Sequence, residues 1–389
     1  MTRVAGFTST GSKRPEALFG EQLDGLPARM TRSSGCRVWD DRGREYLDFI
    51  SGLGAVALGY GHQAVTEAAI RAVHDGVVGP LPPAAEEELA AEIARLIPAA
   101  HRVRFLKTGA EAMGAAVRLA RVATGRDRVL GCGYHGWLDW CQRTEASGVP
   151  SATLALYADI PFNDPGRARE LIRSAGDSLA AVVFEPVILQ EPDREWLTVL
   201  REETRRVGAL LVIDEIKTVC RLAVGGATER YGLEPDLLVM AKAIASGFPL
   251  AAVCGSEEAM GGIGRTWISS TLATEWVSLA ASLATLRVVV TEKVPAHISR
   301  VGGRLHEGLG RLAGRHEGVV SGVSGIPEMC FLELRNETLS RRFAQEAARR
   351  GLLFKRSAYN FVSLAHDDAI VDRSLGILDE VLSALASAE

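Results

Sequence analysis

The chain has 389 residues, of which 47% are hydrophobic and 24% charged, and its formal net charge at pH 7 is −4. This composition is typical of a globular protein, and the length allows a large core and two domains. Nucleic-acid and anionic-membrane surfaces require clustered positive charge, so we expect neither partner. The N-terminus lacks a secretory signal pattern and no apolar run could cross a bilayer, which favours a cytoplasmic protein.

Six cysteines are scattered along the chain, without a C-x-x-C pair or a histidine at ligand spacing. Several lie in apolar or glycine-rich segments, where cysteine behaves as a small buried hydrophobe. We therefore expect buried thiols and no metal site. The six residues are Cys36, Cys132, Cys141, Cys220, Cys254 and Cys330.

Strand and helix signals alternate from the beginning of the chain. Segments 37–41 and 45–47 predict a hairpin around Asp-Arg-Gly, a turn-forming sequence. Helical periodicity follows at 64–73 and again at 85–96. Such alternation indicates an α/β protein with a mainly parallel sheet.

A strand predicted at 101–106 leads through Lys-Thr-Gly into a helix at 110–122. Backbone N–H groups at the start of a helix bind phosphate, and Gly109 permits a close approach. Thr108 and Glu111 also have the spacing of a capping box, which is a purely structural motif. The two interpretations are compatible, so this junction is a candidate phosphate site that identifies no ligand by itself.

Next along the chain, a glycine-rich loop contains Tyr134 and His135. The tyrosine ring offers an aromatic face on which a flat ligand could stack. Taken alone, the two residues fit a buried structural pair better.

Three continuous apolar runs predict buried strands. These runs cover 179–184, 209–213 and 237–240. Each ends at or near an ionisable residue, namely Glu185, Asp214 or Lys242. Because open α/β sheets bind ligands outside the carboxyl ends of their strands, the three side chains are expected at one ligand-binding edge.

Lys242 and Asp214 have the chemistry of a reactive site. Lys242 stands between alanines after an apolar strand, and partial desolvation lowers the pKa of a lysine so that its amine can attack an aldehyde carbon. The carboxylate of Asp214 needs a cation, such as a protonated pyridine nitrogen, unless it caps a helix. Their separation of 28 residues fits one β-α-β unit, which would place both on the same sheet edge.

The pattern changes beyond about residue 290. Helices are predicted at 295–312, 340–350 and 372–386, and short strands at 329–334 and 361–365. We interpret residues 291–389 as a small α+β domain that the N-terminal segment 1–50 joins. Residues 51–290 then form the large ligand-binding domain.

Taken together, these segments resemble the class III aminotransferases, which are pyridoxal 5′-phosphate (PLP) enzymes of fold type I. Within that family they are most similar to the glutamate-1-semialdehyde aminomutase branch. The resemblance extends from about Arg37 to Ala365. The motifs that carry it are 38–49, 108–126, Tyr134-His-Gly136, Val212-Ile-Asp-Glu215 and 235–249.

The resemblance implies a role for each residue around the cofactor ring. Lys242 would form the Schiff base and move the α-proton, and Asp214 would pair with the pyridine nitrogen. Ile216 and Tyr134 would cover the two ring faces. Gln190 stands where the aminomutase branch has an asparagine near the phenolic oxygen of the cofactor.

The resemblance also implies the phosphate contacts and a partner. Thr108, Gly109 and Ala110 would surround the phosphate, and Glu185 matches the Glu-Pro-Val motif of the family. Thr271 matches a threonine that reaches the phosphate from the neighbouring subunit. A homodimer with shared active sites is therefore expected.

The departures from the family pattern lie on the substrate side. The family's Gly-Asn-Pro is replaced by Ala273-Thr-Glu-Trp276, and Thr-Gly-Phe-Arg by Thr218-Val-Cys-Arg221. Ala358-Tyr-Asn-Phe361 stands where the aminomutases have Glu-Ala-Gly. We therefore expect PLP as the cofactor, but not glutamate-1-semialdehyde as the substrate.

Three further residues are candidate substrate contacts. Arg14 could hold a carboxylate through its planar guanidinium, and an exposed basic turn is the alternative. Glu275 and Trp276 could line the pocket from the partner chain. A glutamate there would favour a substrate with hydroxyls or a second amine.

The predicted function is that of an aminotransferase moving an amino group between an amino acid donor and a small oxo substrate, in specialised metabolism. One alternative keeps PLP without net transamination, as an aminomutase, an epimerase, or an enzyme of elimination or C–C bond formation. Another is a catalytically inactive binding subunit, which the intact Lys242 and Asp214 disfavour. The sequence identifies neither donor, acceptor nor pathway.

Overall fold

The computed structural model describes residues 3–21, 24–143 and 147–387, and it divides into two compact units. The larger unit is Gln63–Pro295, and the smaller one combines Met1–His62 with Ala296–Glu389. The boundaries therefore differ from the expected ones at 50/51 and 290/291.

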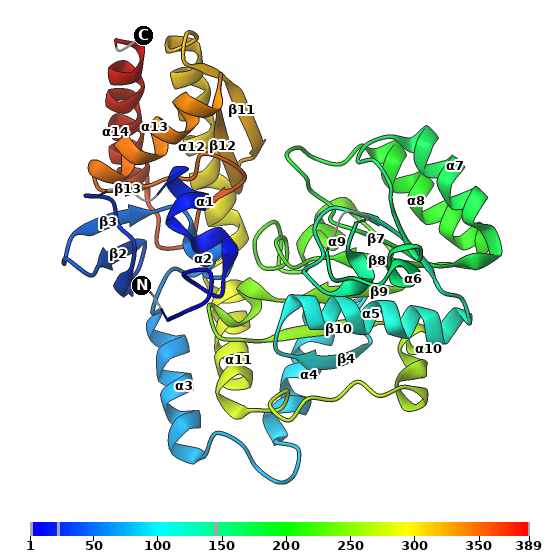
Figure 1. The fold of residues 1–389 in the computed structure, drawn as a ribbon. Helices are drawn as coiled ribbons and strands as arrows, with labels where there is room; N and C mark the ends of the chain where they lie inside the picture. The colour runs from blue at the N-terminus through cyan, green and yellow to red at the C-terminus, as the bar shows by residue number, and fades with distance from the viewer. Residues whose placement is uncertain (1–2, 22–23, 144–146, 388–389) are drawn as a thin grey trace. The chain divides into compact units, whose positions relative to one another are not determined.

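A seven-stranded sheet forms the centre of the larger unit, in the order β4-β10-β9-β8-β7-β5-β6 (Figure 1). The strands are β4 (Arg102–Leu106), β5 (Arg128–Cys132), β6 (Tyr157–Asp159), β7 (Leu179–Phe184), β8 (Leu210–Asp214), β9 (Leu237–Met240) and β10 (Ala251–Gly255). The pairs from β6 through β9 are parallel, and β10 is antiparallel to both of its neighbours. The prediction of an α/β fold with a large, mainly parallel sheet is confirmed.

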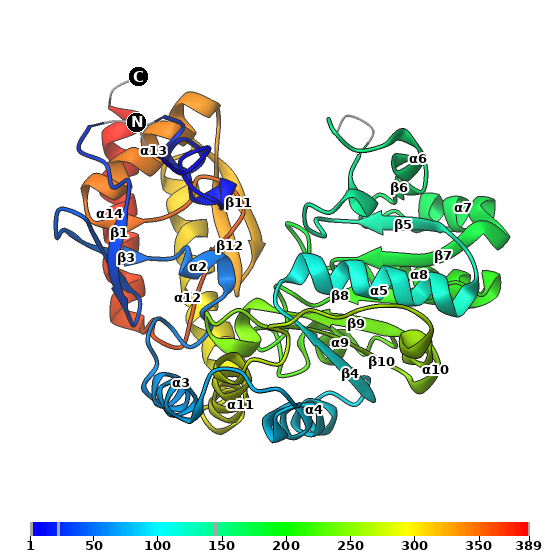
Figure 2. The ribbon, with the colours of Figure 1, turned by 60° about the horizontal axis from the view of Figure 1, so that its bottom comes forward.

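Helices cover both faces of this sheet, which explains why its central strands are apolar throughout. Ala181 and Val183 of β7 belong to the core shared with α5 (Gly109–Thr124), which lies along the strands in Figure 2. Val182 and Phe184 alternate with them and pack into the opposite core, which includes α7 (Pro165–Ala175) and α8 (Arg194–Val207). A strand that is buried on both faces has a continuous run of hydrophobic residues in its sequence, as β7 has.

The larger unit contains further helices, several of them short. They are α3 (Gln63–Asp75), α4 (Ala84–Leu96), α6 (Ser151–Leu154), α9 (Gly226–Tyr231), α10 (Glu257–Met260) and α11 (Trp276–Thr291). Of these, α11 packs against both α3 and α4. In the part of the chain that the structure describes, no helix is long and apolar enough to cross a membrane.

Two small sheets and their helices form the smaller unit. One sheet has the order β1-β2-β3-β13 and the other β11-β12-β14. Their strands are β1 (Met30–Ser34), β2 (Arg37–Asp40), β3 (Glu45–Asp48), β11 (Val320–Ile326), β12 (Met329–Leu334), β13 (Leu352–Leu353) and β14 (Asn360–Phe361). The helices are α1 (Pro15–Phe19), α2 (Ser51–Gly54), α12 (Val294–Arg315), α13 (Glu337–Arg349) and α14 (Asp368–Ala386).

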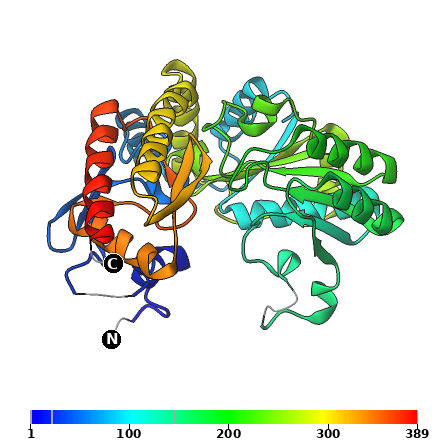
Figure 3. The same ribbon diagram turned by 90° about the horizontal axis from the view of Figure 1, so that it is seen from above.

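Long-range pairing holds the smaller unit together. The predicted hairpin is confirmed, because β2 and β3 pair antiparallel, and β3 also pairs parallel with β13. Helices α12 and α14 lie side by side (Figure 3) and are joined by an Arg304–Asp372 ion pair of 2.7 Å. The N-terminal segment thus shares a fold with the C-terminal residues.

Residues 51–62 belong to the smaller unit because their hydrogen bonds reach segments far away in the sequence. The hydroxyl of Ser51 donates to the Phe361 carbonyl at 3.1 Å, and the Leu364 amide donates to the Ala57 carbonyl at 2.8 Å. Gly59 has a φ of +86°, and a Cβ there would lie 2.9 Å from the Gly35 carbonyl oxygen. These contacts explain why the boundary falls after His62.

The strand predicted at 361–365 is wrong beyond Phe361. Ser363 donates its amide to Nδ1 of His366 at 3.1 Å, so the backbone turns instead of extending. The six cysteines are free and buried, as expected.

Candidate functional site

The sheet order brings three of the predicted side chains to neighbouring strand ends. Glu185 follows β7, Asp214 ends β8, and Lys242 comes two residues after β9. Because β7, β8 and β9 are adjacent and parallel, their carboxyl ends meet at one edge of the sheet. In open α/β sheets this edge is where ligands bind.

Lys242 is a half-buried lysine in an unusual backbone conformation. Its φ is +50°, in the left-handed region that non-glycine residues rarely adopt, and such outliers cluster at functional sites. Burial lowers its pKa, and the positive charge of Lys217 lowers it further. A lysine with a lowered pKa is the better nucleophile near neutral pH.

Asp214 is held from two sides. Its Oδ2 lies 2.8 Å from Nδ1 of His135, and both side chains are almost completely buried. Its Oδ1 accepts the Ile216 amide at 3.1 Å. The His135 ring stacks on Trp140, with centroids 6.1 Å apart. Among the described residues, Nε2 of His135 has no hydrogen-bond partner.

The beginning of α5 faces the loop that follows Asp214. A Cβ at Gly109 would lie 2.6 Å from Cδ1 of Ile216, so a larger residue there would require this side chain to shift. A Cβ at Gly136, whose φ is +102°, would lie 2.6 Å from Cβ of Ala110. The aliphatic side chain, the tyrosine–histidine loop and the helix N-terminus therefore converge.

Thr108 caps this helix as its spacing predicts. Its hydroxyl accepts the Glu111 amide at 3.2 Å, and the Glu111 carboxylate accepts the Thr108 amide at 2.9 Å. The capping box orients the first turn, so the amides of Gly109 and Ala110 remain candidate anion donors.

Tyr134 and Glu185 meet through the backbone. The Tyr134 amide donates to Oε2 of Glu185 at 3.0 Å, and Oε1 of Glu185 lies 2.9 Å from Nζ of Lys217. Tyr134 as a whole is 68% exposed. Glu185 thus fixes the loop that carries Tyr134 instead of facing solvent.

The structure does not bring every predicted residue into this group. Gln190 has an exposed side chain and takes no part in the contacts just described; Thr271, which is expected to reach the site of the neighbouring subunit, is exposed as well. Two residues without a predicted role in the site belong to it: His135, which the sequence suggests only as a structural partner of Tyr134, and Lys217. Their chain positions gave little signal, because each is defined by a contact to a residue distant in the sequence.

Glu275 has a structural role that differs from the predicted substrate contact. It caps α11 by accepting the amides of Val277 and Ser278 at 2.8 and 2.9 Å, and it pairs with Nζ of Lys107 at 2.7 Å. Burial opposes ionisation, but the hydrogen bonds from Lys107 and Ser278 bring the pKa of Glu275 below its usual value. These three donors take up most of the roughly four acceptor positions of the carboxylate, which leaves little capacity for a substrate.

Trp276 contacts other residues of the larger unit, to which it belongs. Its amide donates to the Val77 carbonyl at 2.9 Å, and a Cβ at Gly79 would lie 3.0 Å from its ring. The half-buried indole therefore covers the segment after α3 in this structure.

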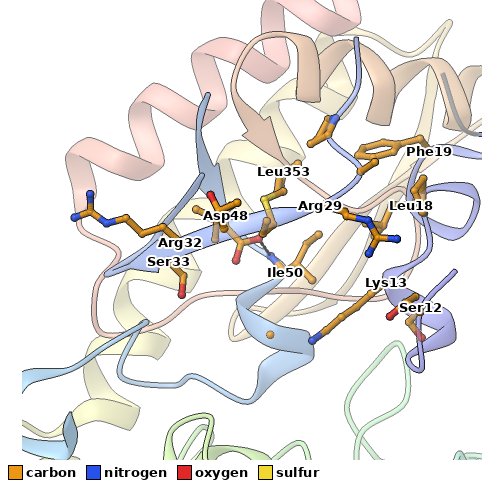
Figure 4. A pocket seen from close by; sticks show the side chains of 18 of the residues that line it. Ser12, Lys13, Leu18, Phe19, Arg29, Arg32, Ser33, Asp48, Ile50 and Leu353 are labelled. Atoms are coloured by element: carbon orange, nitrogen blue, oxygen red, sulfur yellow. Dashed lines mark hydrogen bonds between the residues drawn. The ribbon is translucent and has the colours of Figure 1, made fainter. Parts of the chain in front are cut away.

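Arg14 lies in the smaller unit with an exposed side chain. A cavity of about 630 Å³ in this unit is lined by Lys13, not by Arg14. Lys13 and Arg29 line this cavity (Figure 4), and so does Arg32, whose guanidinium lies over the Trp39 ring. The Asp48 carboxylate at its wall accepts the Tyr60 hydroxyl at 2.7 Å.

Comparisons with known proteins agree with this geometry. The family model described as "Aminotransferase class-III" matches residues 19–385. The glutamate-1-semialdehyde 2,1-aminomutase of Neisseria gonorrhoeae is 30% identical, over 99% of this chain and 98% of the relative.

Solved structures are similar over nearly the whole chain. One described as "Transaminase with PLP bound" has a TM-score of 0.92 at 24% identity, covering 99% of this chain and 96% of that one. A β-phenylalanine aminotransferase from Variovorax paradoxus has a TM-score of 0.84 at 25% identity, covering 98% and 94%.

Proposed function

The chain belongs to the class III aminotransferase family, and on this premise we propose that it is a PLP-dependent aminotransferase. It would move an amino group between an amino acid donor and a small oxo substrate. The observation that carries the proposal is the placement of Lys242 and Asp214 at adjacent strand ends.

The residues at this edge fit the cofactor. Lys242 has the lowered pKa that an amine needs to bond to an aldehyde. Asp214, oriented by His135, offers a buried carboxylate for a protonated ring nitrogen. The N-terminus of α5 suits a phosphate, and Ile216 lies beside it as an apolar surface for one ring face.

When bound, PLP supplies an electron sink that stabilises negative charge at the α-carbon of the substrate. Nζ of Lys242 takes the proton from that carbon, acting as the general base. Asp214 would pair with the ring nitrogen and favour its protonated form, and His135 holds Asp214 in place. Glu185 fixes the Tyr134 loop through its backbone amide.

The proposal is tested on the half-reaction. Purified protein is loaded with PLP and mixed with a panel of amino acids in the absence of an oxo acceptor. A true donor should release one equivalent of keto acid and leave pyridoxamine phosphate, and adding a keto acid should restore PLP. Failure to bind PLP at all would contradict the proposal, and bound PLP with no turnover would favour a non-catalytic subunit.

An aminomutase is the second candidate, because curated relatives that match almost the entire chain bear that name. An aminomutase returns the amino group to the same molecule, so isomerised product forms without a free keto acid. The segment Ala358-Tyr-Asn-Phe361, which stands in place of Glu-Ala-Gly, argues against glutamate-1-semialdehyde as its substrate.

We also propose that the protein is a homodimer with shared active sites. Exposed apolar side chains gather on the second half of α3 and the segment after it, where a partner subunit would cover them. They are Ile70, Val73, Val77, Val78 and Leu81. A cytoplasmic location stays a prediction.

A further inference from the structure

One carboxylate connects three neighbouring strand ends of the larger unit. Tyr134 comes after β5, Glu185 after β7 and Lys217 after β8, and the sheet order places β7 between the other two strands. Oε2 of Glu185 accepts the Tyr134 amide at 3.0 Å, and Oε1 lies 2.9 Å from Nζ of Lys217. Glu185 therefore links the loop after β5 to the segment after β8.

Lys217 and Glu185 form an ion pair with little access to water. Their side chains are 12% and 8% exposed, and Nζ of Lys217 also donates to the Val187 carbonyl at 3.5 Å. Removing the ammonium would leave the Glu185 carboxylate buried without its opposite charge, so the carboxylate would have to turn to water or take up a proton. The position and charge of Glu185 therefore depend on Lys217.

The loop that carries Tyr134 is placed through its backbone. Tyr134 is largely exposed, so the packing of its ring within this chain contributes little to its position. Gly133, just before it, has a φ of +109°, and a Cβ there would lie 2.6 Å from Oε2 of Glu185. The carboxylate thus approaches the bare backbone closely, and its bond to the Tyr134 amide determines where the tyrosine lies.

Stability alone is a weak explanation for this ion pair. Replacing a buried ion pair with well-packed apolar residues is often neutral or stabilising, because both charges lose their hydration. Glu185, however, bonds a loop amide as well as the ammonium, and hydrogen bonds to ionised groups are shorter and stronger than neutral ones. The arrangement is understandable if its purpose is to fix the geometry of the loop.

We propose that Lys217 is a positioning residue for Tyr134: through Glu185 it holds the loop after β5 so that the tyrosine ring covers the cofactor ring. The inference rests on the proposed function, which gives Tyr134 this role. Lys217 acts through its contact with Glu185, and it requires no contact with the cofactor or the substrate.

The first measurement is hydrogen exchange of the Tyr134 amide in the full chain without cofactor, followed by peptide mass spectrometry. Lys217→Met removes the charge and keeps a long unbranched side chain. We expect the amide to exchange roughly tenfold faster, because its hydrogen bond weakens when Glu185 turns away or becomes neutral. Circular dichroism checks that the variant is folded, and Lys217→Gln takes its place in both measurements if it is not.

Arg201→Met is the matched control for the loss of an ion pair. Arg201 pairs with Asp236 at 2.9 Å, also in the larger unit, and the two side chains are only 15% and 26% exposed. Neither residue contacts the Tyr134 loop through the hydrogen bonds described above. Exchange of the Tyr134 amide should therefore be the same in Arg201→Met as in wild type.

The second measurement relates the loop to the cofactor. PLP retention is compared by dialysis for wild type, Lys217→Met, Tyr134→Ala and the variant with both substitutions. We expect Lys217→Met to weaken retention roughly two- to tenfold, which corresponds to the loss of one aromatic contact. In the Tyr134→Ala background the same substitution should have no further effect, because the ring that Lys217 positions is absent.

Two results would overturn the inference. One is an unchanged exchange rate of the Tyr134 amide in the folded variant. The other is an equal loss of PLP retention with and without the Tyr134 ring, which is what a merely structural lysine would give. A wild type that binds no PLP would instead contradict the proposed function, and the exchange measurement would still show whether Lys217 holds the loop.

Discussion

His135 controls the orientation of Asp214 through one buried hydrogen bond of 2.8 Å. Replacing His135 with Phe should remove the histidine from the Asp214 carboxylate and leave the Ile216 amide as a donor to it. A lost hydrogen bond to a charged group costs about 1.5–3 kcal/mol. We expect roughly 10- to 100-fold weaker PLP retention, measured by dialysis against a PLP-free buffer.

His135→Asn is the matched control, because its amide can still donate to the carboxylate. It should recover part of the PLP affinity. Equal affinity in His135→Phe and wild type would remove His135 from the cofactor site.

Lys242 is expected to destabilise the cofactor-free protein. Because burial lowers its folded pKa, the unfolded chain binds more protons between that pKa and about 10.4, and stability rises with pH across this window. Lys242→Met should therefore raise the thermal midpoint at neutral pH, and the gain should vanish above about pH 10.4. Thermal unfolding at both pH values, with Lys293→Met as control, measures this difference.

At the scale of elements, Glu275 joins the N-terminus of α11 to the segment before α5. Replacing it with Ala removes the helix cap and leaves Lys107 half-buried without its ion partner. Loss of an N-cap typically costs about 1 kcal/mol. We expect Glu275→Ala to lower the free energy of unfolding by about 1–2 kcal/mol in urea denaturation.

Glu275→Gln removes the charge and keeps one of the two cap acceptor oxygens, so its loss should be smaller. Donor preference should be the same in both variants. A change in donor preference without loss of stability would restore the substrate contact that the sequence suggested.

Elements whose residues form a recognisable pattern along the sequence were predictable. The apolar runs 179–184 and 237–240 match β7 and β9 to the residue, because burial on both faces demands continuous hydrophobicity. The bounds of the short β14 were not predictable, because the Ser363 amide donates to the His366 ring and turns the chain there. The same distinction applies to the site: strand ends revealed Lys242 and Asp214, but not their partners.

The partners were hidden because they come from other segments. His135 meets Asp214 across 79 positions of sequence, and no periodicity encodes that distance. Likewise, the pairing of Glu275 with Lys107 depends on the fold, and the sequence, which predicts a substrate contact for Glu275, carries no signal of it.

At the scale of the whole molecule, the family and the fold predicted from the sequence are confirmed. The dimer stays a proposal, and its test is mutational. Val78→Glu or Leu81→Glu places a charge among the exposed apolar side chains of residues 70–81. We expect at least a tenfold weaker association in sedimentation velocity, since an unpaired buried charge is costly.

Val290→Glu adds the same charge to another exposed valine, outside residues 70–81. It should leave the association unchanged. A monomeric wild type at all concentrations would contradict the proposal directly.

The parallel pairing of β3 with β13 has a consequence for biosynthesis. Leu47 pairs with Leu352, so the first sheet of the chain lacks one of its strands until most of the polypeptide has left the ribosome. The larger unit, by contrast, is a single stretch of sequence, Gln63–Pro295, and can fold while translation continues. The nascent N-terminal segment would therefore remain partly unpaired until β13 is synthesised. A chaperone that shields β-strand edges would act on this segment first.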